Sequence, residues 1–197
     1  MGLEVIVAYP HALALTLGLA AACVDPPTAP TAPAAEERAR RSPQREVEEL
    51  LRARHPEDLP SRATLERVEG VGAVLRGLAT GADELIVRAR AAEALGQLGH
   101  EEDVPFLVAL AQDTTQHGKV RAAAIIGLGH VDLAGRSEAI AMLGATARAG
   151  DPRLGPEAAS VIAASPAAAA LRDELRADVA LTPAVKAALN AALEAPR

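Results

Sequence analysis

The feature that most constrains this chain is a segment that recurs along its second half. It reads VRARAAEALGQLG from Val87, VRAAAIIGLGHV from Val120, LGPEAASVIAAS from Leu154 and VKAALNAALEAP from Val185. The four starts are 33, 34 and 31 residues apart. A near-constant period of this length is typical of chains built from stacked supersecondary units, because a single unit cannot bury its own apolar face.

Each copy has the apolar spacing of an α-helix. In the first copy the apolar positions Val87, Ala91, Leu95 and Leu98 lie on one stripe of a helix. Composition agrees, since 47 alanines and 25 leucines fill 72 of the 197 positions and both residues favour helices. Aromatic residues, which favour strands, number only one Phe and one Tyr, with no Trp. The sequence therefore predicts an all-α fold.

A second helix is predicted after each of the first three copies. The first of them reads VPFLVALAQ, with Asp103 as its cap and Pro105 in its first turn, a position that tolerates proline. The other two are predicted near residues 136–148 and 167–177. Acids that could cap the first helices precede each of them, at Asp83, Asp113 and Asp151. Glycines predicted to end the first helices in a left-handed conformation are Gly96, Gly99, Gly127, Gly129 and Gly135.

The pattern V-R-x-x-A-A-x-A-L-G-x-L-G is matched throughout by Val87–Gly99. It resembles the HEAT-like repeat named after phycobilisome lyases. The resemblance implies antiparallel helix pairs stacked into a short, curved α-solenoid of three to four repeats with caps. It covers residues 83–197, and residues 45–82 are then an N-terminal helical cap with a degenerate repeat.

The first 44 residues differ in kind from the repeats. Residues 12–23 read ALALTLGLAAAC, an apolar run with the length of a signal-peptide core and too short to span a bilayer. Its end, LAAAC, resembles a bacterial lipobox, which implies cleavage after residue 22 and lipidation of Cys23. Residues 23–44 are Pro- and Ala-rich and are expected to be a disordered tether. The alternatives are an ordinary cleaved export signal and a buried N-terminal helix with an incidental cysteine.

The sequence carries little that indicates chemistry. It has no phosphate-binding loop, dinucleotide fingerprint, nucleophile elbow or HExxH motif, the common signatures of catalysis. The net charge of −6 argues against nucleic acid, which needs a basic surface. His100 with Glu101, Glu102, His117 or His130 could be drawn as a metal site, which needs three or four convergent ligands. The favoured alternative is that the histidines lie at helix C-termini, where partial positive charge is favourable. We therefore expect no catalytic residue, no cofactor, no metal and no small-molecule substrate.

Three arginines allow two interpretations. Arg88 and Arg121 occupy the same repeat position, and with Arg90 they could form an anion-binding row along the stack. The alternative is a structural role, in which they pair with acids of neighbouring repeats such as Asp113. The resemblance to the HEAT-like repeat favours the structural role.

The function expected from these features is a protein-binding scaffold in the bacterial cell envelope, on the periplasmic side or at the outer membrane. It would bind an unidentified protein and reach the membrane through its lipid. Its interaction surface is predicted on the second helices, at Phe106, Gln112, Arg136 and Arg172. A structural envelope spacer and a lyase-like enzyme accessory are the alternatives.

Overall fold

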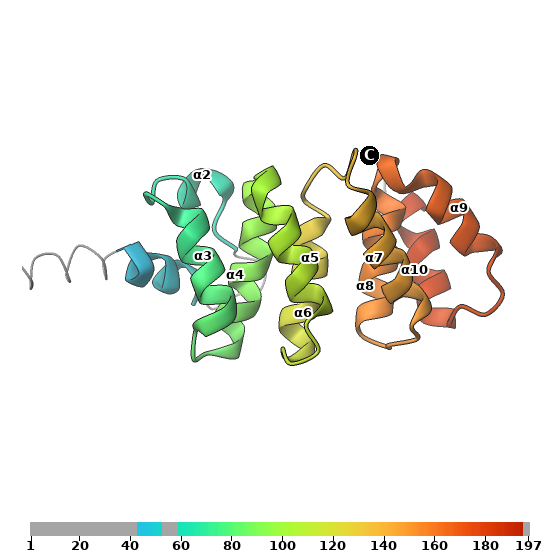
Figure 1. Ribbon diagram of the computed structural model, residues 1–197, viewed down its shortest axis with the longest axis horizontal. Helices are drawn as coiled ribbons and strands as arrows, with labels where there is room; N and C mark the ends of the chain where they lie inside the picture. The colour runs from blue at the N-terminus through green and yellow to red at the C-terminus, as the bar shows by residue number, and fades with distance from the viewer. Residues whose placement is uncertain (1–42, 53–58, 195–197) are drawn as a thin grey trace, which may run out of the picture.

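The computed structural model describes residues 43–52 and 59–194, and this part of the chain is helical with no strand. A helix over residues 43–51 comes first. After it come α2 (Arg62–Leu65), α3 (Val71–Gly81), α4 (Leu85–Leu98), the 3₁₀ turn η1 (Glu101–Asp103), α5 (Val104–Gln112), α6 (Gly118–Leu128), α7 (Ser137–Arg148), α8 (Leu154–Ala164), the 3₁₀ turn η2 (Pro166–Ala168), α9 (Ala169–Ala177) and α10 (Pro183–Glu194) (Figure 1). The predicted all-α class is confirmed. Cys23 and the signal-peptide residues lie outside the described ranges.

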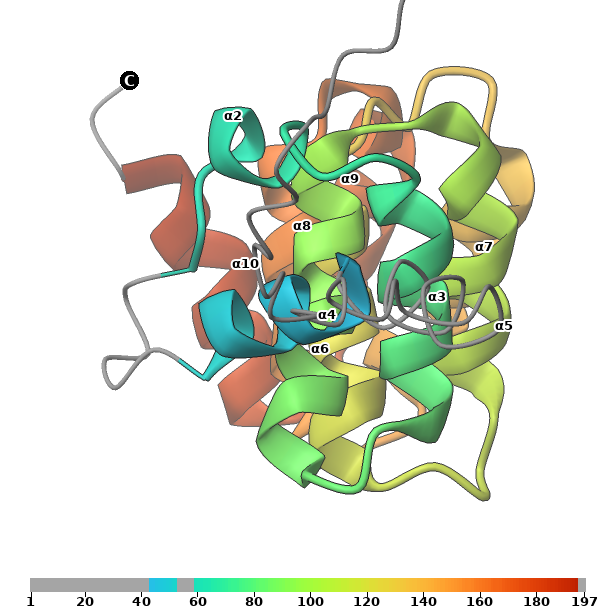
Figure 2. The ribbon, with the colours of Figure 1, turned by 90° about the vertical axis from the view of Figure 1, so that its left-hand side faces the viewer.

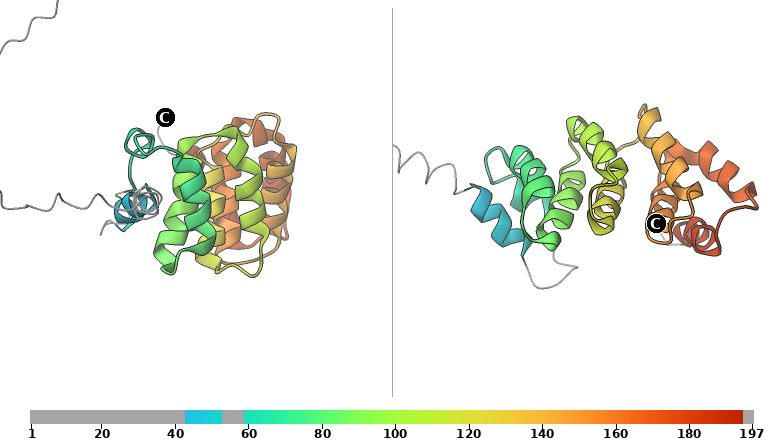
Figure 3. Two further views of the ribbon diagram at one scale, coloured as in Figure 1. Left: turned by 60° about the vertical axis from the view of Figure 1, so that its left-hand side comes forward. Right: turned by 60° about the horizontal axis from the view of Figure 1, so that its bottom comes forward.

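The helices pack in two layers. The four helices that begin with a repeat copy, α4, α6, α8 and α10, contact one another in sequence, and α3, α5 and α7 lie on one side of the first three (Figure 2). Two further views show helix 43–51 at one end of the molecule and α9 with α10 at the other (Figure 3). The second helices α5, α7 and α9 contact one another much less than the first helices do. The tighter layer is therefore the one made by the repeat copies.

The repeat register predicted from sequence is the register of the core. The first residues of the four copies, Val87, Val120, Leu154 and Val185, are at most 3% exposed. Each takes the equivalent place early in α4, α6, α8 or α10. Leu95, predicted to lie on the apolar stripe of the first copy, is fully buried. One continuous cluster of apolar side chains runs from residue 47 to residue 189.

Glycines set the close approach of neighbouring helices, and here two of the sequence predictions are wrong. Gly96 and Gly127 lie inside α4 and α6 rather than ending them. A Cβ on Gly96 would overlap the backbone of Gly127, and one on Gly127 would lie 2.9 Å from the carbonyl oxygen of Ala92. Only glycine allows α4 and α6 to pack at this separation.

Of the three remaining glycine predictions, two are confirmed and one is wrong. Gly99 ends α4 with φ 69°, and Gly135 has φ 73° in the loop before α7, so both are left-handed as predicted. Gly129, at the end of α6, has φ −69°. The prediction of a left-handed residue is therefore wrong at Gly129, where an added Cβ would lie 3.1 Å from the side chain of Val161 in α8.

The predicted helix caps are corrected at three of four positions. Asp151 behaves as predicted, since its Oδ1 accepts from the backbone N–H groups of Arg153 and Leu154 at 2.8 and 2.9 Å. Asp83 makes no cap, and α4 begins after Glu84 without a side-chain hydrogen bond. Asp113 instead accepts from Thr115 in a local turn, and His117 Nδ1 caps α6 by accepting from the N–H of Lys119.

Asp103 was also predicted as a cap, and it makes no side-chain capping bond to α5. Its carboxylate is 1% exposed and accepts from Arg76 of α3. Burial explains the difference, because a buried carboxylate requires a counter-charge that the backbone of α5 alone does not supply.

Among the described residues no single helix is long and apolar enough to cross a membrane. Helices over Leu154–Ala164 and Pro166–Ala177 reach the length only as a pair, which is bent by 102°. Most of α8 belongs to the core described above.

Candidate interaction surface

The four residues predicted to form an interaction surface lie on the second helices or at their starts. Phe106 of α5 is half-buried and packs against the core. Gln112, the last residue of α5, is exposed. Arg136 precedes α7 and Arg172 lies in the first turn of α9. Phe106 and Gln112 are about 9 Å apart along the axis of α5, at 1.5 Å per residue. Because Arg136 adjoins α7 and Arg172 lies on α9, the predicted surface extends along three successive helices.

Several charged side chains on the side of the second helices form ion pairs with one another. Arg136 donates to Glu101 at 2.5 Å, and Arg148 of α7 donates to Glu174 of α9 at 2.6 Å. Together with the Arg76–Asp103 pair, these contacts link α3 to η1, η1 to α7, and α7 to α9. Arg76, Arg136 and Arg148 therefore act between neighbouring repeats, and none of them is among the arginines for which the sequence predicted such a role.

The two repeat-position arginines behave differently from each other. Arg121 Nε donates to the carbonyl oxygen of Ala111 near the end of α5, at 2.8 Å. Asp113, the acid named as a partner from sequence, makes no direct bond to it. The pKa of Asp113 is lowered mainly by the hydrogen bond from the Thr115 hydroxyl, with a smaller contribution from the charge of Arg121. Arg88 is half-buried, and its Nε has no hydrogen-bond partner within the described chain.

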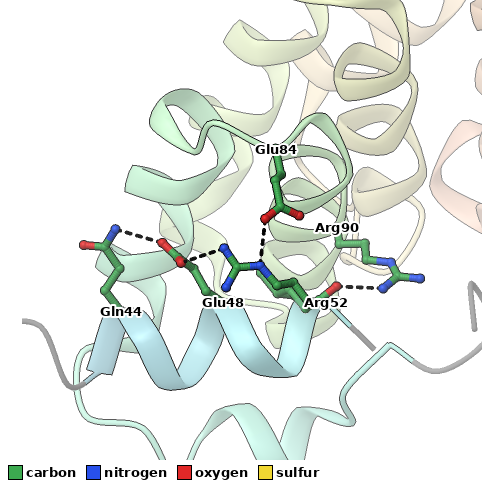
Figure 4. Close-up of polar contacts among 6 residues, drawn as sticks. Gln44, Glu48, Arg52, Glu84 and Arg90 are labelled. Carbon is green, nitrogen blue, oxygen red and sulfur yellow. Dashed lines mark hydrogen bonds and ion pairs between the residues drawn. The ribbon is translucent and has the colours of Figure 1, made fainter. Parts of the chain in front are cut away.

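Arg90 ties the N-terminal helix to the repeats. Its guanidinium is 8% exposed and donates to the carbonyl oxygen of Leu51, at the end of helix 43–51, at 2.7 Å (Figure 4). A cation at the C-terminal end of a helix satisfies a carbonyl that has no intrahelical partner. It also interacts favourably with the negative end of the helix dipole. Arg90 is therefore a docking residue for this helix, which a sequence interpretation as an anion-binding row did not foresee.

A second contact supports the same junction at the surface. Arg52 donates to Glu84, before α4, at 2.9 Å and to Glu48 at 3.2 Å, and Gln44 donates to Glu48 (Figure 4). The hydrogen bond to Glu84 is the main cause that raises the pKa of Arg52 above its ordinary value. Exposed pairs of this kind stabilise a fold little, so the buried Arg90–Leu51 contact is the stronger half of the junction.

The opposite side of the first-helix layer carries a stripe that the sequence analysis missed. Counting from the start of each copy, the seventh residues are Glu93, Ile126 and Ser160, and all three are half-buried. The fourth and eleventh residues continue the stripe at helical spacing, and they are Arg90, Gln97, Ala123, His130, Glu157 and Ala164. Arg90 and Ala123 are buried, and His130 lies just after the end of α6. We call these nine residues the first-helix face. Aligning the copies by their core positions would have found it from sequence.

Two carboxylates of the first-helix face are half-buried and unpaired. Glu93 on α4 and Glu157 on α8 make no hydrogen bond or ion pair with any residue that the structure describes. Burial is the main cause that raises the pKa of Glu93. The positive charges of His130 and Arg90 oppose the rise, and the negative charge of Glu157 adds to it. These two acids therefore lie close enough to repel each other.

In the described ranges no group of three or more His, Cys, Asp or Glu side chains could hold a metal ion. A cleft of about 410 Å³ lies where α6 and α8 begin and is lined by Gly118, Asp151, Pro152, Arg153 and Leu154. It holds no nucleophile next to a base. His117, the nearest histidine in sequence, is engaged as the cap of α6.

Comparison with protein-family models, with curated proteins and with solved structures found no significant match.

Proposed function

We propose that this chain is a non-catalytic HEAT-like repeat scaffold that binds a protein partner and is held in the bacterial cell envelope by a lipid on Cys23. The observation that carries the scaffold proposal is the repeat register. Val87, Val120, Leu154 and Val185 are buried equivalents on helices that contact one another in order. An array of this kind offers an extended surface on each side of its helix layer, which suits recognition of another protein.

An alanine scan separates this function from catalysis. Binding spread over several helices predicts graded losses of activity in the cell when surface residues are replaced singly. An enzyme predicts one or two positions whose alanine variants stay folded and lose all activity. A folded, fully inactive variant at His100, His117 or His130 would contradict the scaffold proposal, and circular dichroism supplies the check on folding.

The anchor is tested separately through the only cysteine of the chain. Cys23→Ala should release the protein from membranes that retain the wild type, because the thioether-linked lipid is lost. The wild type should also gain the mass of its lipid and lose residues 1–22. Equal release of both proteins, with Met1 still at the N-terminus of the wild type, would contradict the anchor while leaving the scaffold proposal standing.

A further inference from the structure

The two sides of the first-helix layer differ in how their charges are satisfied. On the side of α3, α5 and α7, the buried Asp103 and the exposed Glu101 and Glu174 all meet arginines of a neighbouring repeat. On the first-helix face, Glu93 and Glu157 form no ion pair with any described residue, although the charges of His130 and Arg90 act on Glu93 from a distance. The carboxylates on the side of α3, α5 and α7 therefore form ion pairs with arginines of a neighbouring repeat, whereas the arginine on the first-helix face, Arg90, donates to a backbone carbonyl instead.

Leaving these carboxylates unpaired has a cost to the folded state. A half-buried carboxylate loses hydration, and a like charge nearby adds to the penalty. Both effects act on Glu93, where burial and Glu157 raise the pKa. Glutamine would fill the same space at either position without the charge. Groups held in an unfavourable ionisation environment are more frequent at functional sites than elsewhere.

The middle of the face is apolar. Between the two acid-bearing helices lies α6, which contacts both α4 and α8 and places Ile126 at the repeat position that Glu93 occupies on α4. The close approach at Gly96 and Gly127 brings α4 and α6 together and so shortens the distance across the face. A surface with a carboxylate on each side and an aliphatic floor suits the long aliphatic stem and cationic head of Lys or Arg.

We propose that the first-helix face binds a partner segment rich in Lys or Arg, whose cationic groups pair with Glu93 and Glu157 and whose apolar atoms cover Ile126. This inference rests on the proposed scaffold function and names the chemistry of the partner. The charge of the whole chain, −6, favours the same kind of partner, since opposite potentials steer association. The occupant is a segment of another protein rather than a second copy, because two such faces would repel each other.

The test compares two double variants with the same change in net charge. Glu93→Gln/Glu157→Gln removes both acids of the face. Glu69→Gln/Glu138→Gln removes two exposed acids, one in the turn before α3 and one on α7. The probe is a fluorescent 12-residue peptide of alternating Arg, Ala and Leu, measured by anisotropy against the full-length protein. A second peptide with every Arg replaced by Gln shows how much binding depends on positive charge.

The expected result is a loss of peptide affinity of at least about tenfold in Glu93→Gln/Glu157→Gln, since truncating one partner of a desolvated pair is costly. The control double variant should change affinity less than about threefold, because it alters only the long-range attraction. Glu93→Gln/Glu157→Gln should also melt at a higher temperature than wild type. A role of the two acids in holding the fold together would lower that temperature instead.

Three outcomes would overturn the proposal. Equal losses in both double variants would mean non-specific attraction to an acidic protein. Equal affinity for the Arg and Gln peptides would mean that charge does not drive binding. Self-association of wild type that Glu93→Gln/Glu157→Gln abolishes would make a second copy the occupant. The scaffold function is judged apart from these results, by the alanine scan described above.

Discussion

Glu93 is the residue at which the fold carries the clearest electrostatic penalty. Its pKa is raised from the ordinary value of 4.5, chiefly by burial, under the opposing charges of His130 and Arg90 and the repelling charge of Glu157. The folded state therefore holds a proton more readily than the unfolded state. Stability then falls as pH rises from the unfolded pKa through the folded pKa, and it stays lower above that window.

We predict that Glu93→Gln raises the melting temperature at pH 7, because the charge that the fold penalises is gone. The gain should disappear below about pH 4.5, where wild-type Glu93 is itself protonated in both states. Differential scanning calorimetry between pH 4 and pH 8 measures it, with the exposed Glu69→Gln as the matched control. A melting temperature lowered by Glu93→Gln at pH 7 would show that the carboxylate stabilises the fold.

Leu95 tests the predicted register of the repeats at the residue scale. Its side chain is fully buried in α4, so Leu95→Ala leaves a cavity and should cost about 2–5 kcal/mol. Domains of ordinary size are stable by about 5–15 kcal/mol, so the urea midpoint should fall clearly. Ile86, 50% exposed on the same helix, supplies the control, and Ile86→Ala should move the midpoint much less. An unchanged midpoint for Leu95→Ala would contradict the register.

Sequence reasoning succeeded for residues whose environment follows from helical period alone. Val87, Ala91, Leu95 and Leu98 form the buried stripe of α4 as predicted. It failed where the partner of a side chain lies far away in the sequence. Asp103 looks like a cap because it stands just before a helix, and only the fold brings Arg76, 27 residues earlier, within reach of its carboxylate.

At the scale of helices, the structure depends on glycines at the interfaces. Gly96 and Gly127 meet between α4 and α6, and Gly155 of α8 faces Val185 of α10, where an added Cβ would lie 3.1 Å from the valine side chain. Sequence position suggested helix ends for the first two, because glycine is common there. The two uses of glycine leave the same local signal, so only the packing of two helices distinguishes them.

A matched pair of substitutions tests this role. Gly96→Ala should destabilise the protein by about 1–3 kcal/mol, because the new methyl group overlaps backbone that cannot move without separating α4 from α6. Gly77 lies in α3 with nothing within 4 Å of an added Cβ, and Gly77→Ala should stabilise by about 0.5–1 kcal/mol through helix propensity. Both are measured by chemical denaturation. Similar effects at the two positions would show that α4 and α6 are not in such close contact.

At the scale of the whole molecule, the order of the helices could be predicted from sequence. The difference in burial and ion pairing between the two sides of the first-helix layer could not. The repeat period gave the first and second helices, because stacking follows from apolar stripes of constant phase. The second-helix surface at Phe106, Gln112, Arg136 and Arg172 remains an untested prediction from sequence, and the first-helix face is the competing proposal. The first-helix face was identified from the structure, by comparing burial and ion pairing on the two sides of the first-helix layer. Neither property can be derived from the repeat period of the sequence.

Site-specific photocrosslinking in the cell tests whether this chain binds its partner through the first-helix face. A benzophenone side chain would replace Gln97, on the first-helix face of α4, or Gln112, exposed at the end of α5. We predict a crosslinked protein partner from position 97 that is lost in the Glu93→Gln/Glu157→Gln background and kept in the Glu69→Gln/Glu138→Gln background. A partner captured only from position 112, or one captured from position 97 regardless of Glu93 and Glu157, would contradict the account.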